Sequence, residues 1–331
     1  MKGQASGLIS HRISQRTPGA LALSAALAAL LPLPGGTLAA SPDSPAAAPQ
    51  AAKAGTSSTA IVIVDDDGRS IALSAPARRV ITLAPHATEL VYAAGGGDRL
   101  VATVASSDYP PAARALPRVG LGMTINAESL AAHAPDLVIG WRTGRMDPAA
   151  TALARLGTPL FVSAPGTLAD IPGTLERFGG LLGTQAVAQP AADALRTRLA
   201  TLAARYAHKP PVRVFVQIGE RPLYTLNGTH IVSDMLRTCG AVNVFADLAL
   251  PAPQVSEESV LAARPDAVLL GAGPDTPRLV QAWQARGLPA AVSGHAHALD
   301  PDTLWRPGPR MVDAAEALCP LLDAARHRDP P

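Results

Sequence analysis

Residues 126–140 read NAESLAAHAPDLVIG and residues 256–270 read SEESVLAARPDAVLL, so one arrangement occurs twice in the chain. Each copy has a residue suited to cap a helix, a Glu two positions later, a short helical segment, and Pro-Asp before an apolar run. The Glu precedes the Pro by seven positions in both copies, Glu128 before Pro135 and Glu258 before Pro265. The repeat predicts two lobes related by an approximate two-fold axis, with the two Glu side chains at equivalent surface positions.

A Glu in the first turn of a helix has a second interpretation, which applies to Glu128 and Glu258 alike. Its charge complements the helix dipole, an effect of roughly 0.3 to 1 kcal/mol that needs no partner. The matched pair favours a functional role, because a symmetric partner would need the same charge once in each lobe.

Short apolar runs alternate with helical patterns on both sides of the repeat. This alternation predicts β-α units and mostly parallel sheets covered by helices. A β-hairpin is expected first, from 60–64 to 70–73 around Asp66-Asp67-Gly68. The expected strands are 80–83, 100–104, 137–140 and 160–162 in a first series, and 212–218, 242–245, 267–270 and 290–292 in a second.

One long amphipathic helix is expected between the two series, because apolar residues recur at steps of three and four from Ala192 to Tyr206. A helix over 184–208 would be about 37 Å long, enough to bridge two lobes. Pro190 moves its expected start to 188–190, because proline is tolerated in a first turn. The predicted fold class is α/β, with two Rossmann-like lobes of mostly parallel sheets, 59–183 and 209–328, joined by one long interlobe α-helix, 184–208.

The first 40 residues have the order of a secretory signal peptide. Basic residues up to Arg16 precede an apolar stretch at 20–33, and the small residues Thr37, Ala39 and Ala40 follow. A retained membrane anchor is the alternative, but it would need roughly 20 continuous apolar residues. Residues 41–58 are rich in Ala, Pro and Ser, which is typical of a disordered linker. The chain is therefore expected in the periplasm after the signal peptide is removed.

Net charge and cysteine content further narrow the partners and the kinds of site that the chain can have. The formal net charge is +2 and no basic run alternates with aromatics, so a nucleic-acid partner is not expected. The chain has two cysteines, Cys239 and Cys319. In an oxidising compartment an isolated pair indicates a disulfide, and a metal site or a catalytic thiol is the weaker alternative.

Six further stretches carry a likeness to a known family. They are RVITLAP at 79–85 followed by ATEL at 87–90, SDYPP at 107–111, DLVIGWR at 136–142, RVFVQ at 213–217, PQVS at 253–256, and Pro309-Arg310 ahead of Cys319. In this order they resemble the periplasmic binding proteins that have a single rigid interlobe helix, and among these the cobalamin-binding proteins of vitamin importers. The resemblance implies a non-catalytic monomer that captures cobalamin or a related corrinoid and delivers it to the membrane-spanning permease subunits of an ABC importer.

The resemblance also implies roles for individual residues. It places Tyr109, Trp141 and Tyr224 on the walls of the ligand cleft, with Asp302 and Arg306 as polar cleft residues. It implies that Glu128 and Glu258 pair with arginines of the permease, and that Cys239 and Cys319 form the disulfide. Aromatic walls with a few polar groups suit a broad corrinoid with amide side chains.

Some positions depart from the resemblance. Gly122 and Ala252 stand where further cleft tryptophans are expected, so the pocket has room for a different corrinoid or a flat macrocycle such as haem. His86 is a surface or helix-start residue in the simpler interpretation, and an axial ligand of haem iron or cobalt if it faces the cleft. His295 and His297 lack a third partner for zinc. No metal site and no cofactor are predicted.

Two alternative functions remain open. The same scaffold serves haem or a ferric siderophore, and Arg142 and Arg306 are compatible with an anionic ligand. A secreted hydrolase is the alternative from another class, but the sequence has no Gly-x-Ser-x-Gly and no His-Glu-x-x-His. An enzyme is therefore not predicted.

Overall fold

The computed structural model describes residues 60–121, 124–141 and 147–326. The predicted signal peptide at 1–40 and linker at 41–58 lie outside the described residues, as do Gly122 and Arg142. None of the helices in the described ranges is long and apolar enough to cross a membrane.

The chain begins with the predicted β-hairpin, in which β1 (Ile61–Val64) pairs antiparallel with β2 (Ser70–Leu73). The buried carboxylate of Asp65 closes its turn by accepting hydrogen bonds from the backbone N–H groups of Asp67 and Arg69 and from the Arg69 guanidinium. These bonds satisfy a carboxylate that would otherwise be costly to bury, so the loop is held in one conformation.

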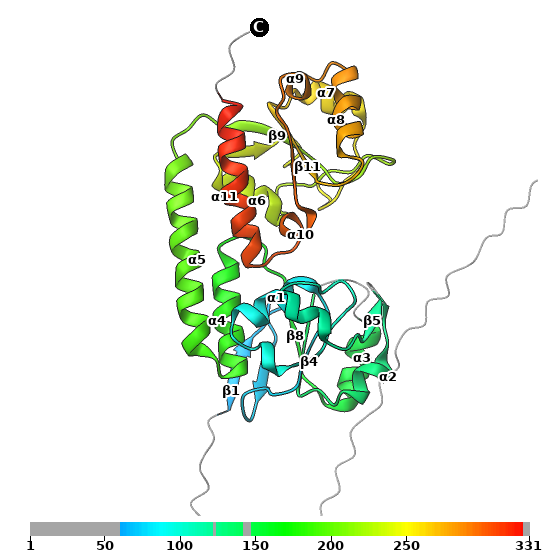
Figure 1. Ribbon diagram of the computed structural model, residues 1–331, viewed down its shortest axis with the longest axis vertical. Coiled ribbons are helices and arrows are strands. Elements are labelled where there is room, and N and C mark those ends of the chain that lie inside the picture. The colour runs from blue at the N-terminus through cyan, green and yellow to red at the C-terminus, as the bar shows by residue number, and fades with distance from the viewer. Residues whose placement is uncertain (1–59, 122–123, 142–146, 327–331) are drawn as a thin grey trace, which may run out of the picture. The chain divides into compact units, whose positions relative to one another are not determined.

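Two separate parallel sheets of four strands follow (Figure 1). The first has the order β4-β3-β7-β8, built from β3 (Val80–Thr82), β4 (Leu100–Ala102), β7 (Leu137–Gly140) and β8 (Leu160–Val162). The second has the order β10-β9-β11-β12, built from β9 (Val212–Gln217), β10 (Ala241–Asn243), β11 (Ala267–Gly271) and β12 (Ala296–Leu299). Each sheet thus uses its first strand as an inner strand and adds the later strands in the same order. The predicted α/β fold with two parallel-sheet lobes is confirmed.

Helices cover these sheets. The first lobe contains α1 (Pro85–Ala93), α2 (Ala127–Ala132), α3 (Asp147–Leu156) and α4 (Asp170–Leu182), with the small hairpin of β5 (Gly120–Leu121) and β6 (Thr124–Ile125) and the 3-10 helices Gly97–Arg99 and Pro111–Ala115. The second lobe contains α6 (Ile231–Thr238), α7 (Glu257–Ala263), α8 (Thr276–Ala285), α9 (Pro289–Val292), α10 (Pro301–Leu304) and α11 (Pro309–Ala324).

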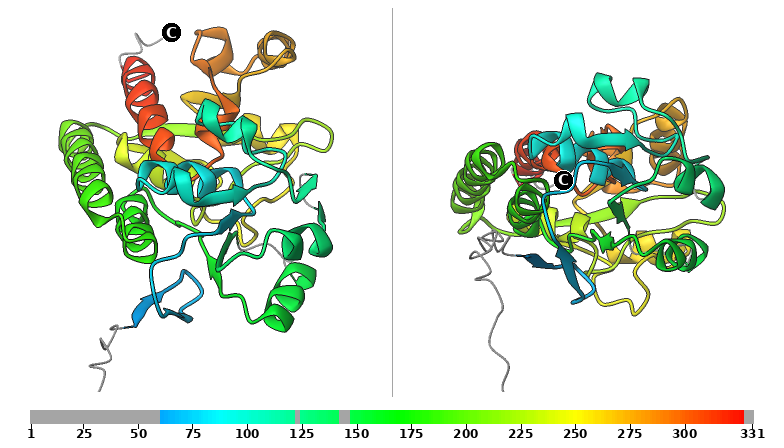
Figure 2. Two further views of the ribbon diagram at one scale, coloured as in Figure 1. Left: turned by 60° about the horizontal axis from the view of Figure 1, so that its bottom comes forward. Right: turned by 90° about the horizontal axis from the view of Figure 1, so that it is seen from below.

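The long helix predicted between the lobes is α5 (Gln185–Tyr206). It packs against α4, and the two helices lie side by side in every view (Figures 1 and 2). Gly179 permits this close approach, because a Cβ at that position would lie 2.5 Å from the Cβ of Ala188. Apolar side chains of α5 such as Leu195 and Tyr206 belong to one core cluster that contains buried residues of both lobes.

One predicted boundary and one predicted element type were wrong. The helix was expected to start at 188–190 but begins at Gln185, so Pro190 lies inside it. Proline there costs one backbone hydrogen bond to the carbonyl of residue 186, and both positions are exposed, so water can satisfy that carbonyl. Residues 290–292 were expected as a strand but form α9, because Pro289 suits the first turn of a helix and cannot donate to a sheet. The fourth strand of the sheet is β12.

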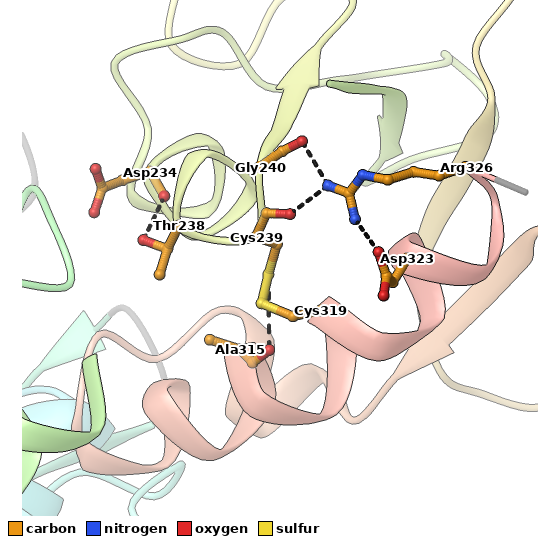
Figure 3. The surroundings of a disulfide bond; sticks show 8 residues. All are labelled: Asp234, Thr238, Cys239, Gly240, Ala315, Cys319, Asp323 and Arg326. Carbon is orange, nitrogen blue, oxygen red and sulfur yellow. Dashed lines mark hydrogen bonds and ion pairs between the residues drawn. A yellow bond between two sulfur atoms is a disulfide. The ribbon is translucent and has the colours of Figure 1, made fainter. Parts of the chain in front are cut away.

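The predicted disulfide is present and joins Cys239, at the end of α6, to Cys319 in α11 (Figure 3). Both cysteines are fully buried. The guanidinium of Arg326 donates to the carbonyl oxygens of Cys239 and Gly240 at 2.7 Å each and pairs with Asp323 at 2.8 Å. The C-terminal helix is therefore held to the second lobe by a covalent bond and by hydrogen bonds beside it.

Candidate functional site

The repeated unit has the same capped structure in both lobes. The side chain of Asn126 accepts a hydrogen bond from the Ser129 N–H at 2.9 Å, and that of Ser256 accepts one from the Ser259 N–H at 3.2 Å. These caps satisfy donors that the first helical turn leaves unpaired. They start α2 and α7 one residue before Glu128 and Glu258, respectively, and both carboxylates are exposed.

The structural repeat extends beyond the stretch found in the sequence. Asp136 accepts hydrogen bonds from the backbone N–H of Arg79 at 3.0 Å, and Asp266 accepts one from Arg213 N–H at 2.9 Å. Each Arg in turn donates from its guanidinium to a backbone carbonyl at the end of the repeated helix, His133 for Arg79 and Ala263 for Arg213. Each unit is therefore bound to the first strand of its own sheet by equivalent contacts.

The helix of each unit ends in the same way. Ala134 and Arg264, which precede the two prolines, have φ values of 42° and 43°. These are left-handed conformations that non-glycine residues seldom adopt. The shared backbone geometry means that the two Glu-bearing helices are presented on equivalent supports.

Glu128 and Glu258 form no ion pair with any residue in the described ranges. Hydrogen bonds from its own N–H and from Ser256 lower the pKa of Glu258. The neighbouring Glu257 differs, because it forms a bidentate pair with Arg286. Each lobe therefore exposes an equivalent carboxylate that no described side chain neutralises.

The three aromatic residues predicted for the cleft are partly exposed. Tyr109, in the loop after β4, is 43% exposed; Trp141, directly after β7, is 39% exposed; and Tyr224, in the loop after β9, is 37% exposed. The Arg310 guanidinium lies 4.0 Å from the centre of the Tyr109 ring. No contact between any two of these aromatic side chains is found in the described part of the chain. They are large apolar surfaces at three separate places beyond strand ends, where α/β folds bind ligands.

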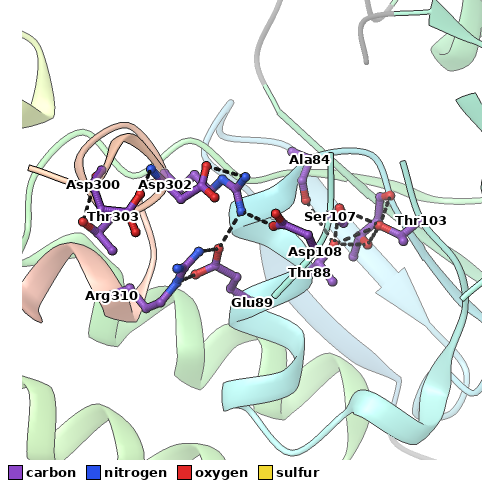
Figure 4. A network of polar contacts seen from close by, with 12 residues as sticks. Ala84, Thr88, Glu89, Thr103, Ser107, Asp108, Asp300, Asp302, Thr303 and Arg310 are labelled. Carbon is purple, nitrogen blue, oxygen red and sulfur yellow. Dashed lines mark hydrogen bonds and ion pairs between the residues drawn. The ribbon is translucent and has the colours of Figure 1, made fainter. Parts of the chain in front are cut away.

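An ionic network joins the two lobes (Figure 4). Arg306 pairs with Asp302 of its own lobe at 2.6 Å and with Asp108 of the first lobe at 2.6 Å. Arg310, at the start of α11, forms a bidentate pair with Glu89 of α1 at 2.6 and 2.9 Å. The side chain of Glu89 is only 2% exposed, so this pair is largely withdrawn from water. Burial opposes ionisation of Asp108, but the hydrogen bond and charge of Arg306 outweigh it and lower the Asp108 pKa.

A buried cluster of hydroxyl groups supports the loop that carries Asp108 (Figure 4). The Thr82 hydroxyl lies 2.7 Å from that of Thr88 and 2.9 Å from that of Thr103, and the hydroxyls of Thr88 and Thr103 donate to that of Ser107 at 2.9 and 2.8 Å. All four side chains are buried, and their hydroxyls are satisfied by one another and by the backbone carbonyls of Ala84 and Thr82, which lie within reach of Thr88 and Thr103. This cluster therefore fixes Ser107, the residue immediately before Asp108.

His86 does not face a cleft. It is the second residue of α1, is 1% exposed, and its Nε2 lies 3.1 Å from the carbonyl oxygen of Ser163. Its ring packs edge-on against Trp141, with ring centres 5.4 Å apart. The hypothesis of an axial ligand therefore has no support in this geometry. The His86 side chain instead packs against the Trp141 ring and supports it.

The burial of His86 should make the folded protein less stable in acid. Burial lowers the pKa of His86 from 6.5 to about 4. Between these two values the unfolded chain binds a proton that the folded chain refuses, so stability falls as the pH drops from 6.5 to 4. At about 1.4 kcal/mol per pH unit, His86 contributes up to roughly 3 kcal/mol of this loss. Urea unfolding of the wild type and His86→Gln at pH 7 and pH 4 measures the difference. His230 and His297, whose pKa values are also lowered by burial, act in both proteins. Equal losses in the two proteins would contradict the assignment.

The sequence profile of the periplasmic binding proteins matches residues 80–301. The chain belongs to the periplasmic binding protein family. The family resemblance seen in the sequence is thereby confirmed.

Curated relatives and solved structures give finer matches. The "Vitamin B12-binding protein" of Vibrio cholerae serotype O1 is 41% identical over 254 residues, which are 76% of this chain and 92% of the relative. The protein of that name from Photorhabdus laumondii is 39% identical, covering 77% of this chain and 91% of the relative. The crystal structure of "periplasmic Vitamin B12 binding protein BtuF of Vibrio cholerae" matches with a TM-score of 0.71 and 40% identity, over 76% of this chain and 99% of that chain. The "periplasmic heme-binding protein RhuT from Roseiflexus sp. RS-1" matches with a TM-score of 0.66 and 25% identity, over 76% and 99%.

The sequence alone did not assign roles to two residues of this periplasmic binding protein that the structure singles out. Glu89 and Arg310 both lie in stretches that carry the family resemblance, yet they are 221 positions apart. The one signal in the sequence for a buried ion pair was Glu89 itself, a charged residue among the apolar positions of α1.

His295 and His297 lie at β12 with ring centres 6.1 Å apart. No group of three metal-binding side chains occurs in the described ranges.

Proposed function

We propose that this periplasmic binding protein captures cobalamin or a related corrinoid and passes it to an ABC importer. The observation that carries the proposal is the 41% identity to a vitamin B12-binding protein across 92% of that relative's length. Tyr109, Trp141 and Tyr224 supply apolar faces for the corrin ring, and Asp302 and Arg306 supply polar contacts to its amide side chains. The ligand lies between a first lobe at 59–183 and a second at 209–328.

Haem is the second candidate, and the geometry favours it less. The haem-binding relative shares 25% identity with the chain, well below the 41% of the vitamin B12-binding protein. His86, the histidine considered for iron, is buried against Trp141. Ferric siderophores remain a further alternative on the same scaffold.

The protein acts in the periplasm, as a monomer, after its signal peptide is removed, and it performs no covalent chemistry. Glu128 and Glu258 contact basic residues of the permease subunits, one from each lobe. Their exposure and their lack of a cationic partner among the described residues support this role.

Calorimetric titration of the mature protein with cyanocobalamin, and separately with hemin, tests the ligand. We expect saturable one-to-one binding of cyanocobalamin and weaker or no binding of hemin. Preferential binding of hemin would move the function to haem uptake while leaving the family unchanged.

Trp141→Ala is expected to weaken cyanocobalamin binding by roughly 30-fold, because removal of a half-exposed aromatic wall costs about 2 kcal/mol at a binding hot spot. Trp141→Phe is the matched control. It keeps an aromatic face and its packing on His86, so it should lose less than about fivefold. Titration of both variants gives the affinities. An unchanged affinity for Trp141→Ala would remove this residue from the cleft.

A further inference from the structure

A cavity of about 220 Å³ lies at the carboxyl end of the second sheet. Its walls come from the ends of β9 and β11 and from α8 and α10, and include Gln217, Glu220, Gly271, Asp275, Arg278 and Trp305. Trp305 directly precedes Arg306, whose guanidinium reaches Asp108 of the first lobe. The cavity therefore lies beside the residues proposed to contact the ligand. It is too small for a macrocycle, since drug-sized ligands occupy roughly 300 to 1,000 Å³, but it has room for one side chain of a ligand.

The polar groups of this cavity are held in place by their own contacts. Arg278 forms a bidentate pair with Glu220 at 2.6 and 2.7 Å and lies 3.5 Å from Asp275. Gln217 is fixed by accepting a hydrogen bond from the buried Trp283 indole at 2.7 Å. The wall thus presents two carboxylates and one guanidinium that is already paired. Arg221 also approaches Glu220, but it is 82% exposed and does not line the cavity.

Trp305 adds a donor without a partner. Its indole N–H has no hydrogen-bond acceptor within the described ranges, and the side chain is only partly buried. Its Nε1 lies 3.3 Å from the position that a Cβ on Gly271 would occupy, so the absence of a side chain at residue 271 leaves the indole edge uncovered. A ligand group in the cavity would therefore face the N–H donor of Trp305 on one side and carboxylate acceptors on another.

We propose that this cavity receives one propionamide side chain of a corrinoid, whose amide accepts a hydrogen bond from Trp305 Nε1–H and donates its NH₂ to Glu220 or Asp275. The inference rests on the proposed function and assigns a specificity role within it. A neutral amide both donates and accepts, so it matches both walls. A carboxylate of the same shape has no proton to donate to the two wall carboxylates, and the Arg278 guanidinium in the wall is already paired with Glu220. The cavity thus selects amide-bearing corrinoids over macrocycles that carry propionates.

The test uses cyanocobalamin and its b-, d- and e-monocarboxylic acids, in each of which one propionamide is replaced by a carboxylate. Titrated against the mature protein, one isomer should bind at least about tenfold more weakly than cyanocobalamin, because its carboxylate cannot donate a hydrogen bond to Glu220 or Asp275 and is repelled by both. Glu220→Gln should recover most of that loss for this isomer, because it removes one repelling charge. Trp305→Phe should weaken cyanocobalamin itself by about five- to tenfold while keeping the aromatic ring.

Glu257→Gln is the matched control, because Glu257 forms the same kind of bidentate pair, with Arg286, outside the cavity. It should change none of these affinities. Binding of all three isomers within about threefold of cyanocobalamin would overturn the subsite and leave the proposed function intact. An equal recovery with Glu257→Gln would also overturn it. If cyanocobalamin itself failed to bind, the proposed function would fail, and the subsite with it.

Discussion

The double variant Glu128→Ala/Glu258→Ala is expected to bind cyanocobalamin with unchanged affinity and to support no detectable uptake. Both side chains are exposed on equivalent helices and form no ion pair with a described residue, so their removal costs the fold little. A partner that docks on both lobes would lose one charge-assisted contact at each. Uptake of cobalt-labelled cyanocobalamin by cells that carry the double substitution in their own copy of the gene measures delivery, and calorimetry measures binding.

The control for this experiment removes two other exposed carboxylates, Asp98 and Asp193, whose side chains are 74% and 59% exposed. Asp98→Ala/Asp193→Ala raises the net charge by the same two units outside the repeated unit, and it should leave uptake near the wild-type rate. Normal uptake by the Glu128/Glu258 variant would contradict the docking role, and so would a loss of cyanocobalamin binding.

Removal of the disulfide is expected to cost roughly 4 kcal/mol of unfolding free energy, because the bond closes a long loop in the unfolded chain. The two cysteines are separated by 80 positions in the sequence. Cys239→Ala/Cys319→Ala should therefore unfold at a much lower urea concentration than the oxidised wild type. The wild type reduced with dithiothreitol serves as the control and should fall close to the double variant. A difference below about 1 kcal/mol between the oxidised wild type and the variant would show that contacts such as those of Arg326 hold α11 without the bond.

Local signals explain why so much of the fold could be predicted. The caps Asn126 and Ser256 act within one helical turn, and Pro-Asp opens a strand in each copy, so the lobes could be inferred from short stretches. The same locality produced the error at 290–292. Ala-Ala-Val is compatible with a strand or a helix, and only the preceding proline and the packing of the two alanines decide for α9.

The candidate site was less accessible to sequence reasoning, because its contacts join distant parts of the chain. Trp141 could be placed at a strand end, but its packing on His86 depends on how α1 lies against β7. The pairing of Glu89 with Arg310 depends on both lobes and on α11. Neither contact has a sequence period or a motif. Family resemblance suggested the candidate positions, and three-dimensional structure supplied their contacts.

The ion pair between Glu89 and Arg310 affects how easily the two lobes can separate. To spread the lobes apart, the chain would have to separate a carboxylate that is 2% exposed from its bidentate partner and hydrate both charges again. This pair therefore opposes spreading of the lobes, and the same resistance applies to entry and to release of a ligand. In the proposed delivery, contact with the importer would help to separate the lobes.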